Sequence, residues 1–317
     1  MLRWFLVIVV AVAGATWFWQ DELWPSSDDG PSSVLLERPA GAGPPMQAAQ
    51  GQPGAGSEPA ESVVAEASQS PVEAEPGRQS LAVVLLEAQN LASSGRQGDA
   101  GELLRLRLRQ PGPPLEMGRL AWVLAGWTKD GGERRSLIAQ AIQAGAIAGP
   151  EYARAGEMLV VMNRTPRTGL LDSIGTELYE VRSGDSLWKI CTKTLKTADG
   201  GRHEPGLLRL LNGLSSDSLT VGQRLLIPMA PLMIQIDRAG HGLVAWLDDV
   251  PVLAYEVGLG REERTPSGEF MVQVKQKNPT WYKNGKAIPF GEPENILGTR
   301  WMGFENQPGV NGYGIHG

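Results

Sequence analysis

The chain has 317 residues, of which 42% are hydrophobic and 6% aromatic, and its formal net charge is -6. This length is enough for about two domains of ordinary size, each with its own apolar core. A negative net charge provides no basic field to attract phosphates, so we do not expect a nucleic acid as a partner. The single cysteine, Cys191, excludes a disulfide within the chain and a thiolate metal cluster.

The amino terminus has the composition of a membrane segment. After Arg3, residues 4–19 are uncharged and almost entirely apolar, and Asp21 and Glu22 follow them. A helix over residues 1–24 would span a bilayer, and Arg3 would keep its start in the cytoplasm. The small-x-small sequence Ala13-Gly14-Ala15 makes a cleaved signal peptide the alternative. Both interpretations export the rest of the chain, so we expect a cell-envelope protein anchored at the cytoplasmic membrane, with its bulk in the periplasm.

Residues 25–78 have the composition of a disordered linker. They contain nine prolines and seven glycines but no aromatic residue, so little apolar surface is available to offset the entropy lost on ordering. As a flexible coil, this segment would have a root-mean-square reach of about 40 Å. We therefore expect a tether that lets the remaining chain work at a distance from the membrane.

Residues 79–165 show the apolar spacing of short helices. The first is expected after Ser80, a suitable N-cap, because apolar residues then recur three and four positions apart. Breakers such as the sequence PGPP at 111–114 separate the later helices, which we place at Asp99–Arg109, Leu115–Thr128, Glu133–Ala144 and Glu151–Met162. Stacked hairpins of this kind resemble tetratricopeptide-like arrays. A protein partner for this segment and a plain helical spacer both remain open.

A second module covers residues 178–229. The sequence YEVRSGDSLWKI predicts a short strand, a turn, and a helix that Asp185 or Ser186 can cap. A second helix over Pro205–Asn212 should end at Gly213, and a strand over Leu219–Pro228 should close the module. This order of strand, helix, helix and strand resembles the LysM module.

The LysM resemblance implies binding of N-acetylglucosamine-containing glycan, here peptidoglycan, in a shallow groove between two loops. By position, the lining would be Gly184, Asp185, Ser186 and Leu187 on one side and Asn212, Gly213, Leu214 and Ser215 on the other. Helix capping is the alternative explanation for the residue types at Asp185, Ser186 and Gly213.

Two residues of this module have reactive side chains, but the sequence favours a non-catalytic position for each. Cys191 falls on one helical face with Leu187 and Ile190, so we expect it to fill the core as a small apolar residue. His203 lies in an inserted loop, residues 196–204, where we expect a solvated side chain.

Residues 231–317 begin with three runs of strand length, namely Leu232–Ile236, Gly242–Leu247 and Pro251–Val257. They continue with TPSGEF at 265–270, NILGTRWMGF at 295–304 and YGIHG at 313–317. In this order the motifs resemble the L,D-transpeptidase catalytic domain of the YkuD type, which implies a mostly-β fold. The whole chain is therefore expected to be multidomain, with a membrane helix, a linker, a helical segment, a small βααβ module and a catalytic sheet.

The resemblance implies peptidoglycan crosslinking through a cysteine acyl-enzyme. His316 and Gly317 occupy the Ile-His-Gly motif, in which the histidine is the general base. The nucleophile of the family lies in a later Ser-x-Gly-Cys-x-Arg segment, so we expect it beyond Gly317. We accordingly expect these 317 residues alone to be inactive and their catalytic sheet to present an unpaired edge. Candidates for the substrate groove are Arg300, Trp301 and Tyr313, although packing explains the tryptophan equally well.

Two other functions remain open at this point. One is a non-catalytic protein that binds the peptidoglycan wall, and the other is hydrolysis of the same thioester by water. The three histidines are scattered and form no cluster with carboxylates, so we expect no metal site, and nothing in the sequence implies a cofactor.

Overall fold

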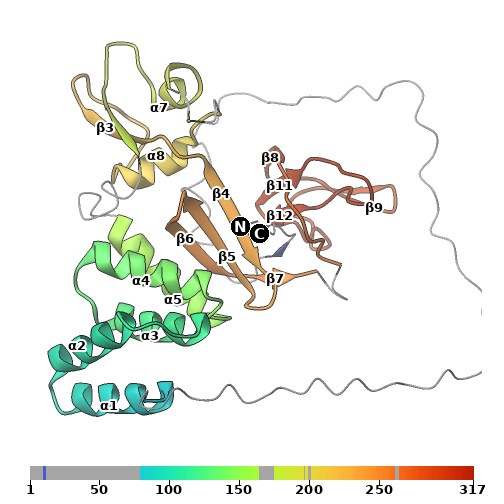
Figure 1. The fold of residues 1–317 in the computed structure, drawn as a ribbon. Coiled ribbons are helices and arrows are strands. Elements are labelled where there is room, and N and C mark those ends of the chain that lie inside the picture. The colour runs from blue at the N-terminus through green and yellow to red at the C-terminus, as the bar shows by residue number, and fades with distance from the viewer. Residues whose placement is uncertain (1–9, 12–78, 164–174, 196, 199–200, 261–263) are drawn as a thin grey trace, which may run out of the picture. The chain divides into compact units, whose positions relative to one another are not determined.

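The computed structural model describes residues 10–11, 79–163, 175–195, 197–198, 201–260 and 264–317 (Figure 1). The expected membrane helix at 1–24 and linker at 25–78 lie outside the described residues, apart from two positions. These two, Val10–Ala11, form a short strand, β1, instead of part of a helix. Within the described ranges, no helix has both the length and the apolar character needed to cross a bilayer.

The expected helical segment is confirmed. Its helices are α1 (Leu81–Ser93), α2 (Gln97–Leu108), α3 (Pro114–Trp127), α4 (Gly131–Gln143) and α5 (Pro150–Asn163). Ser80 caps α1 as predicted, because its side chain accepts a hydrogen bond from the backbone N–H of Val83. Pro114 begins α3, where its missing N–H costs nothing. Apolar side chains at helical spacing then bury one continuous core between the helices.

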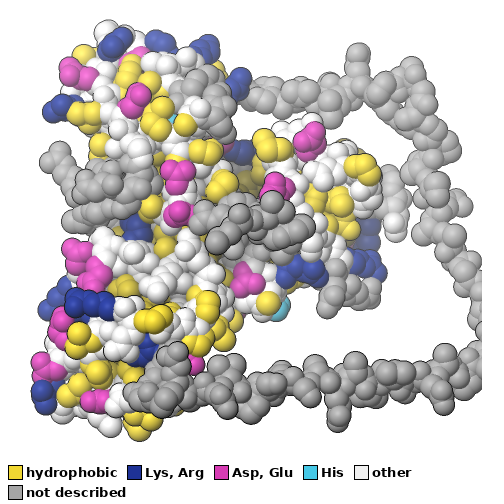
Figure 2. Space-filling view, in the orientation of Figure 1, with side chains coloured by type: hydrophobic (Ala, Val, Ile, Leu, Met, Phe, Trp, Pro, Cys, Tyr) yellow, Lys and Arg dark blue, Asp and Glu magenta, His cyan; other side chains and the backbone are white. Residues whose placement is uncertain are grey.

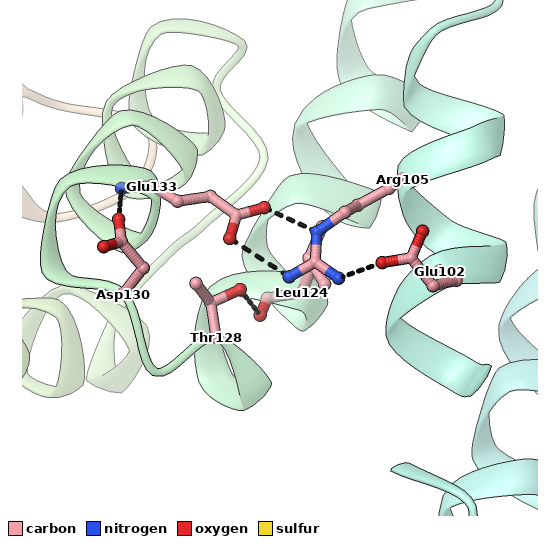
Figure 3. A network of polar contacts seen from close by, with 6 residues as sticks. All are labelled: Glu102, Arg105, Leu124, Thr128, Asp130 and Glu133. Atoms are coloured by element: carbon pink, nitrogen blue, oxygen red, sulfur yellow. Dashed lines mark hydrogen bonds and ion pairs between the residues drawn. The ribbon is translucent and has the colours of Figure 1, made fainter. Parts of the chain in front are cut away.

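Arg105 joins helix α2 to helix α4 across the end of α3 (Figure 3). Its Nε and Nη2 atoms donate to the two carboxylate oxygens of Glu133 at 2.6 and 3.0 Å, and its Nη1 atom donates to Glu102. The hydrogen bond to Glu133 is the main reason that the pKa of Arg105 is raised. Asp130 caps α4 by accepting from the N–H of Glu133, so Glu133 is bonded through both its backbone and its carboxylate.

The LysM-like module has the expected order of elements. Strand β2 (Thr176–Glu180) is followed by α7 (Leu187–Lys189), a π-helical turn η1 (Ile190–Thr194), α8 (Pro205–Leu211) and strand β3 (Arg224–Pro228). The two strands pair antiparallel. Ser186 caps α7, and Gly213 follows α8 with a φ of 61°, so both predicted helix boundaries are confirmed.

Cys191 and His203, the two residues of this module with reactive side chains, are both buried. Cys191 is fully buried, as predicted, and burial raises the pKa of its thiol to about 12. The prediction for His203 was wrong, because this side chain is only 3% exposed. Its backbone N–H donates to the carbonyl of Cys191, which draws the inserted loop against the first helix and buries the imidazole.

The side chain of Asn212 links helix α8 to strand β3. Its Nδ2 donates to the carbonyl of Leu226 at 2.9 Å, and its Oδ1 accepts from the N–H of Leu226 at 2.7 Å. The amide therefore pairs with strand β3 as a neighbouring strand would. A third hydrogen bond, from Nδ2 to the carbonyl of Leu208, ties the same amide to helix α8.

The carboxy-terminal segment is mostly β, as expected. A three-stranded antiparallel sheet has the order β4 (Leu232–Asp237), β5 (Gly242–Leu247), β6 (Val250–Glu256). A second sheet has the order β7 (Gly258–Leu259), β1, β12 (Gly314–His316), β11 (Arg300–Phe304), β8 (Val272–Lys277). Strands β9 (Trp281–Lys283) and β10 (Lys286–Ile288) form a separate hairpin.

The sheet edge at β12 differs from the expectation. Val10 pairs with Ile315 and Ala11 with His316, while the other edge of β1 pairs with β7. The edge that we expected to be unpaired is therefore covered at these two positions. The physical reason is that extended backbone in this place satisfies N–H and C=O groups of both neighbours.

The sheet β4–β5–β6 is buried on both faces. Val244, Trp246 and Ala254 join the core of the helical segment, whereas Leu243 and Leu253 join a second core with Met302, Phe304 and Ile315 of the other sheet. Strands β5 and β6 therefore contribute side chains to both cores. Burial on two faces explains why β5 and β6 are continuous apolar runs.

Helix α5 packs on strand β6 with almost no space between their backbones. A Cβ atom at Gly156 would overlap the carbonyl oxygen of Ala254. Beside this contact, the buried Arg135 donates to the carbonyl of Pro251 and Asn163 donates to the carbonyl of Val252. The helices thus provide the hydrogen-bond donors that the outer edge of β6 needs.

The LysM-like module also packs against the carboxy-terminal sheets. Leu207 and Leu211 of α8 belong to the same apolar core as Ile236 and Leu243. Glu204, just before α8, forms an ion pair with Lys275 of β8. The module is therefore joined to the sheets by side-chain contacts as well as by the chain.

Acidic and basic side chains are interspersed on the face shown in Figure 2. This mixture agrees with the modest net charge of -6 and provides no extended field of one sign.

Substitution of Gly156 by alanine is expected to destabilise the protein. The new methyl group must push α5 away from β6, and overpacking of this kind costs about 1–3 kcal/mol. Urea unfolding followed by circular dichroism measures the change. Gly98→Ala is the matched control, because no atom lies within 4 Å of the added Cβ and alanine favours the helix. Equal stabilities of the two variants would contradict the close contact.

Substitution of Asn212 by alanine should loosen the LysM-like module. It leaves the N–H and C=O groups of Leu226 without their side-chain partner, and each such loss costs about 1–3 kcal/mol where the group is buried. Hydrogen exchange should show faster exchange at β2 and β3. Ser215→Ala, at an exposed position of the following loop, should leave exchange in both strands unchanged.

Candidate functional site

Two glycines form a flat floor beside His316. In the pairing of β11 with β12, Trp301 lies opposite His316 and Gly303 lies opposite Gly314. Since side chains alternate along a strand, all four residues share one face of the sheet. A Cβ at Gly303 would lie 2.8 Å from the indole Nε1 of Trp301, and one at Gly314 would lie 2.7 Å from its Cη2 atom. Only glycine at both positions lets the indole lie on the sheet.

Trp301 and a turn of backbone enclose the His316 imidazole. The two rings have centroids 6.2 Å apart and planes tilted by 34°. Burial is the larger effect on the His316 pKa and lowers it, whereas hydrogen bonds with the backbone of Ile296 and Leu297 act to raise it. Because these bonds favour the cation, the ring donates to backbone carbonyls there. A lowered pKa keeps the imidazole neutral, which is the form that accepts a proton.

The residues around Gly317 are held by backbone contacts. Its carbonyl oxygen accepts hydrogen bonds from the N–H groups of Thr299 and Arg300 at 3.0 and 3.2 Å. Gly298 has a φ of 68°, and a Cβ there would lie 2.5 Å from the carbonyl carbon of Gly317. The turn at 296–299 therefore follows the end of β12 at backbone contact distance.

Sequence reasoning missed Asn295 as a site residue. Its Oδ1 accepts from the N–H of Leu297, and its Nδ2 donates to the carbonyls of Pro279 and Ile288, all at 2.9 Å. The available signal was the spacing Asn-x-x-Gly in NILG, since asparagine often bonds to backbone two residues on and glycine permits positive φ. That spacing indicates a turn but gives no indication of a neighbouring histidine.

The three predicted groove residues are placed differently. Trp301 lies beside His316, as described. Arg300 is one residue away in the strand, so alternation directs its side chain to the other face, although its backbone N–H bonds to Gly317. Tyr313 packs against the second apolar core, and its carbonyl accepts from the N–H of Phe304. Only Trp301 shares the face of His316.

A hollow of about 600 Å³ lies in the loop between α8 and β3 of the LysM-like module. Three predicted glycan-binding residues, Gly213, Leu214 and Ser215, line it. Its remaining lining, which the sequence interpretation did not include, is Ser216, Ser218, Thr220, Val221, Gly222 and Gln223. Hydroxyl and amide groups dominate this set and match a neutral, hydroxyl-rich ligand.

The other predicted glycan-binding residues have partners within the module. Asp185 accepts from the hydroxyl of Tyr179 at 2.7 Å and from the N–H of Arg182 at 2.9 Å, and the first of these bonds is the main reason that its pKa is lowered. Leu187 lies in the core, and Asn212 binds strand β3. Gly184 and Ser186 are exposed but do not line the hollow. A role of these residues in glycan binding stays a prediction.

The described residues supply a base but no exposed thiol. The one cysteine of the chain, Cys191, is fully buried in the LysM-like core, where its raised pKa keeps it protonated. No group of three or more His, Cys, Asp or Glu side chains in the described part of the chain is placed to hold a metal ion.

Comparison with known proteins matches two parts of this architecture. Residues 179–228 match the family profile of the LysM domain, and residues 231–317 match that of the L,D-transpeptidase catalytic domain. A Bacillus subtilis (strain 168) protein named "Putative L,D-transpeptidase YqjB" is 40% identical over 94 residues, which are 29% of this chain and 51% of that protein. The chain thus spans about half the length of this relative. None of the solved structures matches the chain. The chain therefore contains a region similar to the LysM domain, followed by a region similar to the L,D-transpeptidase catalytic domain.

Proposed function

We propose that this protein is an L,D-transpeptidase that crosslinks peptidoglycan stem peptides, with its LysM domain holding the glycan. The observation that supports this most directly is His316, a partly buried base within an Ile-His-Gly motif of the matched catalytic domain. The Bacillus subtilis relative supports the same reaction class, since it is named "Putative L,D-transpeptidase YqjB".

In the proposed reaction, a cysteine thiolate attacks a carbonyl of a donor stem peptide and D-alanine leaves. An amine of a second stem then opens the thioester and completes the crosslink. His316 accepts the thiol proton in the first step and holds it for the leaving amine. In this proposal, bonds to the backbone of Ile296 and Leu297 would orient the ring and leave one ring nitrogen for the reacting groups.

The proposal places the nucleophile in residues that follow Gly317. Cys191 does not serve, because it is buried in another domain and its thiol pKa is raised to about 12. The catalytic family suggests a Ser-x-Gly-Cys-x-Arg segment as the source. Such a segment would add the nucleophile to a site that already contains His316, Trp301 and the turn at 296–299.

The LysM domain is proposed to bind glycan at the hollow between residues 213 and 223. Because α8 packs into the catalytic core, bound glycan would lie at a set distance from His316. We further propose that the apolar amino terminus exports the chain and anchors it at the membrane, which agrees with a substrate outside the cytoplasm. A protein partner of helices α1–α5 remains a secondary proposal.

The crosslinking activity is tested with the full-length protein, including any residues that its gene encodes after Gly317. Purified enzyme is incubated with tetrapeptide muropeptides, and mass spectrometry follows loss of D-alanine and formation of dimers. We expect crosslinked dimers from the wild type and none from His316→Gln, since loss of a general base costs about 10²–10⁴-fold in rate.

Cys191→Ala is the matched control for this experiment. It removes the thiol of the LysM core and should leave crosslinking unchanged. Shortened monomers without dimers would point to hydrolysis by water. Glycan binding with neither product would favour a non-catalytic wall-binding protein and refute the proposed reaction.

The lowered pKa of His316 makes a separate prediction about pH. A base acts only when neutral, and a lowered pKa keeps the imidazole neutral to more acidic pH. The acid limb of kcat/KM should therefore lie below about pH 6.5, the ordinary value for histidine. Trp301→Ala should move this limb to higher pH, because water then reaches the ring and the burial effect weakens. A limb that stays in place would contradict the role of Trp301.

A further inference from the structure

Asn295 is the centre of a small hydrogen-bonded unit next to the base. Its side-chain amide makes three hydrogen bonds of 2.9 Å, all to backbone groups, and the residue is itself half-buried. Its own backbone N–H donates to the carbonyl of Glu292, also at 2.9 Å. A residue held by four bonds of good length has little freedom to move.

Two of these bonds hold the base of the β9–β10 hairpin. Pro279 lies just before β9, and Ile288 is the last residue of β10, paired with Trp281. By donating to both carbonyls, Asn295 clamps the two ends of the hairpin together. The rest of the hairpin projects into solvent, where Tyr282 is 73% exposed.

The third bond fixes the turn that contacts His316. The Oδ1 atom of Asn295 accepts from the N–H of Leu297, which sets the direction of the backbone at Ile296 and Leu297. The same turn contacts the chain next to His316, because a Cβ at Gly298 would lie 2.5 Å from the carbonyl carbon of Gly317 and the N–H of Thr299 donates to the Gly317 carbonyl at 3.0 Å. Backbone hydrogen bonding by Ile296 and Leu297 also acts to raise the His316 pKa. On the far side of the turn, the carbonyl of Thr299 accepts from the N–H of Asn278 at 2.8 Å. The turn is therefore held at both ends by residues bordering the hairpin.

We propose that Asn295 is a positioning residue for catalysis, which holds the backbone of Ile296 and Leu297 against His316 and so selects the imidazole tautomer that the reaction needs. The side chain does not touch the reacting atoms and acts through the turn. This inference rests on the proposed role of His316 as the base. It also links the exposed hairpin to that base, since Asn295 binds both.

The test measures the tautomer of His316 directly in the 317-residue chain. Long-range ¹H–¹⁵N correlation spectra separate the two neutral tautomers, and comparison with His316→Gln assigns the signals. In the wild type we expect one dominant tautomer. In Asn295→Ala, the ratio of the tautomers should fall about fivefold or more, the change produced by losing one hydrogen bond of ordinary strength.

A second variant and a control separate positioning from general instability. Asn295→Asp keeps an acceptor for the N–H of Leu297 but loses both donors to the hairpin, so it should retain more of the wild-type ratio than Asn295→Ala. Asn306→Ala is the control, because its Oδ1 atom accepts one bond, from the N–H of Gly312, in a loop away from the turn. This control should leave the tautomer ratio unchanged.

The possible outcomes decide the inference independently of the proposed function. An unchanged ratio in folded Asn295→Ala overturns it, as does an equal change in Asn306→Ala. If Asn295→Ala does not fold, Asn295→Leu carries the test, because leucine has a similar size and also removes all three side-chain hydrogen bonds. An unchanged ratio in that variant overturns the inference. Absence of crosslinking by the wild type would refute the proposed function but would leave these spectra as they are.

Discussion

Burial of the sheet β4–β5–β6 on both faces is the constraint on which the other parts depend. One face packs against the helices and the other against β11 and β12, so strands β5 and β6 are shielded from water on both faces, whereas the edge strand β4 remains partly exposed. The close contact at Gly156 and the donors of Arg135 and Asn163 let the helices approach the edge strand without leaving carbonyls unpaired. The helical segment is thus part of the catalytic fold, and burial of Arg135 lowers its pKa to about 10 as a consequence.

The same layering gives the second sheet two different faces. Met302, Phe304 and Ile315 point into the core, which leaves Trp301 and His316 on the outer face. The core side chains fix the register of β11 and β12, and this register puts Trp301 opposite His316. The glycine pair keeps the outer face flat, so the base has an aromatic wall and a backbone turn around it while remaining accessible.

The LysM-like module contacts the carboxy-terminal sheets through its side chains as well as through the connecting chain. Leu207 and Leu211 enter the core between the sheets, and the ion pair of Glu204 with Lys275 reaches β8. Since Lys275 pairs in register with Met302, this contact lies on the strand next to the one that carries Trp301. The module is therefore held against the carboxy-terminal sheets by an apolar contact and an ion pair.

The sequence by itself determined much of the local structure of this protein and singled out His316 as the candidate base. Helical spacing after Ser80, the cap at Ser186 and the helix end at Gly213 were predicted because each depends on residues within a few positions. His316 was found in the same way, from its immediate neighbours in YGIHG.

Only the tertiary structure decided the surroundings of that base and the burial of other polar groups. The clamp of Asn295 on Pro279 and Ile288, the placement of Trp301 on two glycines, and the burial of His203 all depend on segments far apart in sequence. No local pattern encodes such contacts, because a hydrogen bond or a packed ring is defined by the partner that folding brings to it. The motif therefore singled out His316 as the candidate base, while the fold decided how its side chain is surrounded.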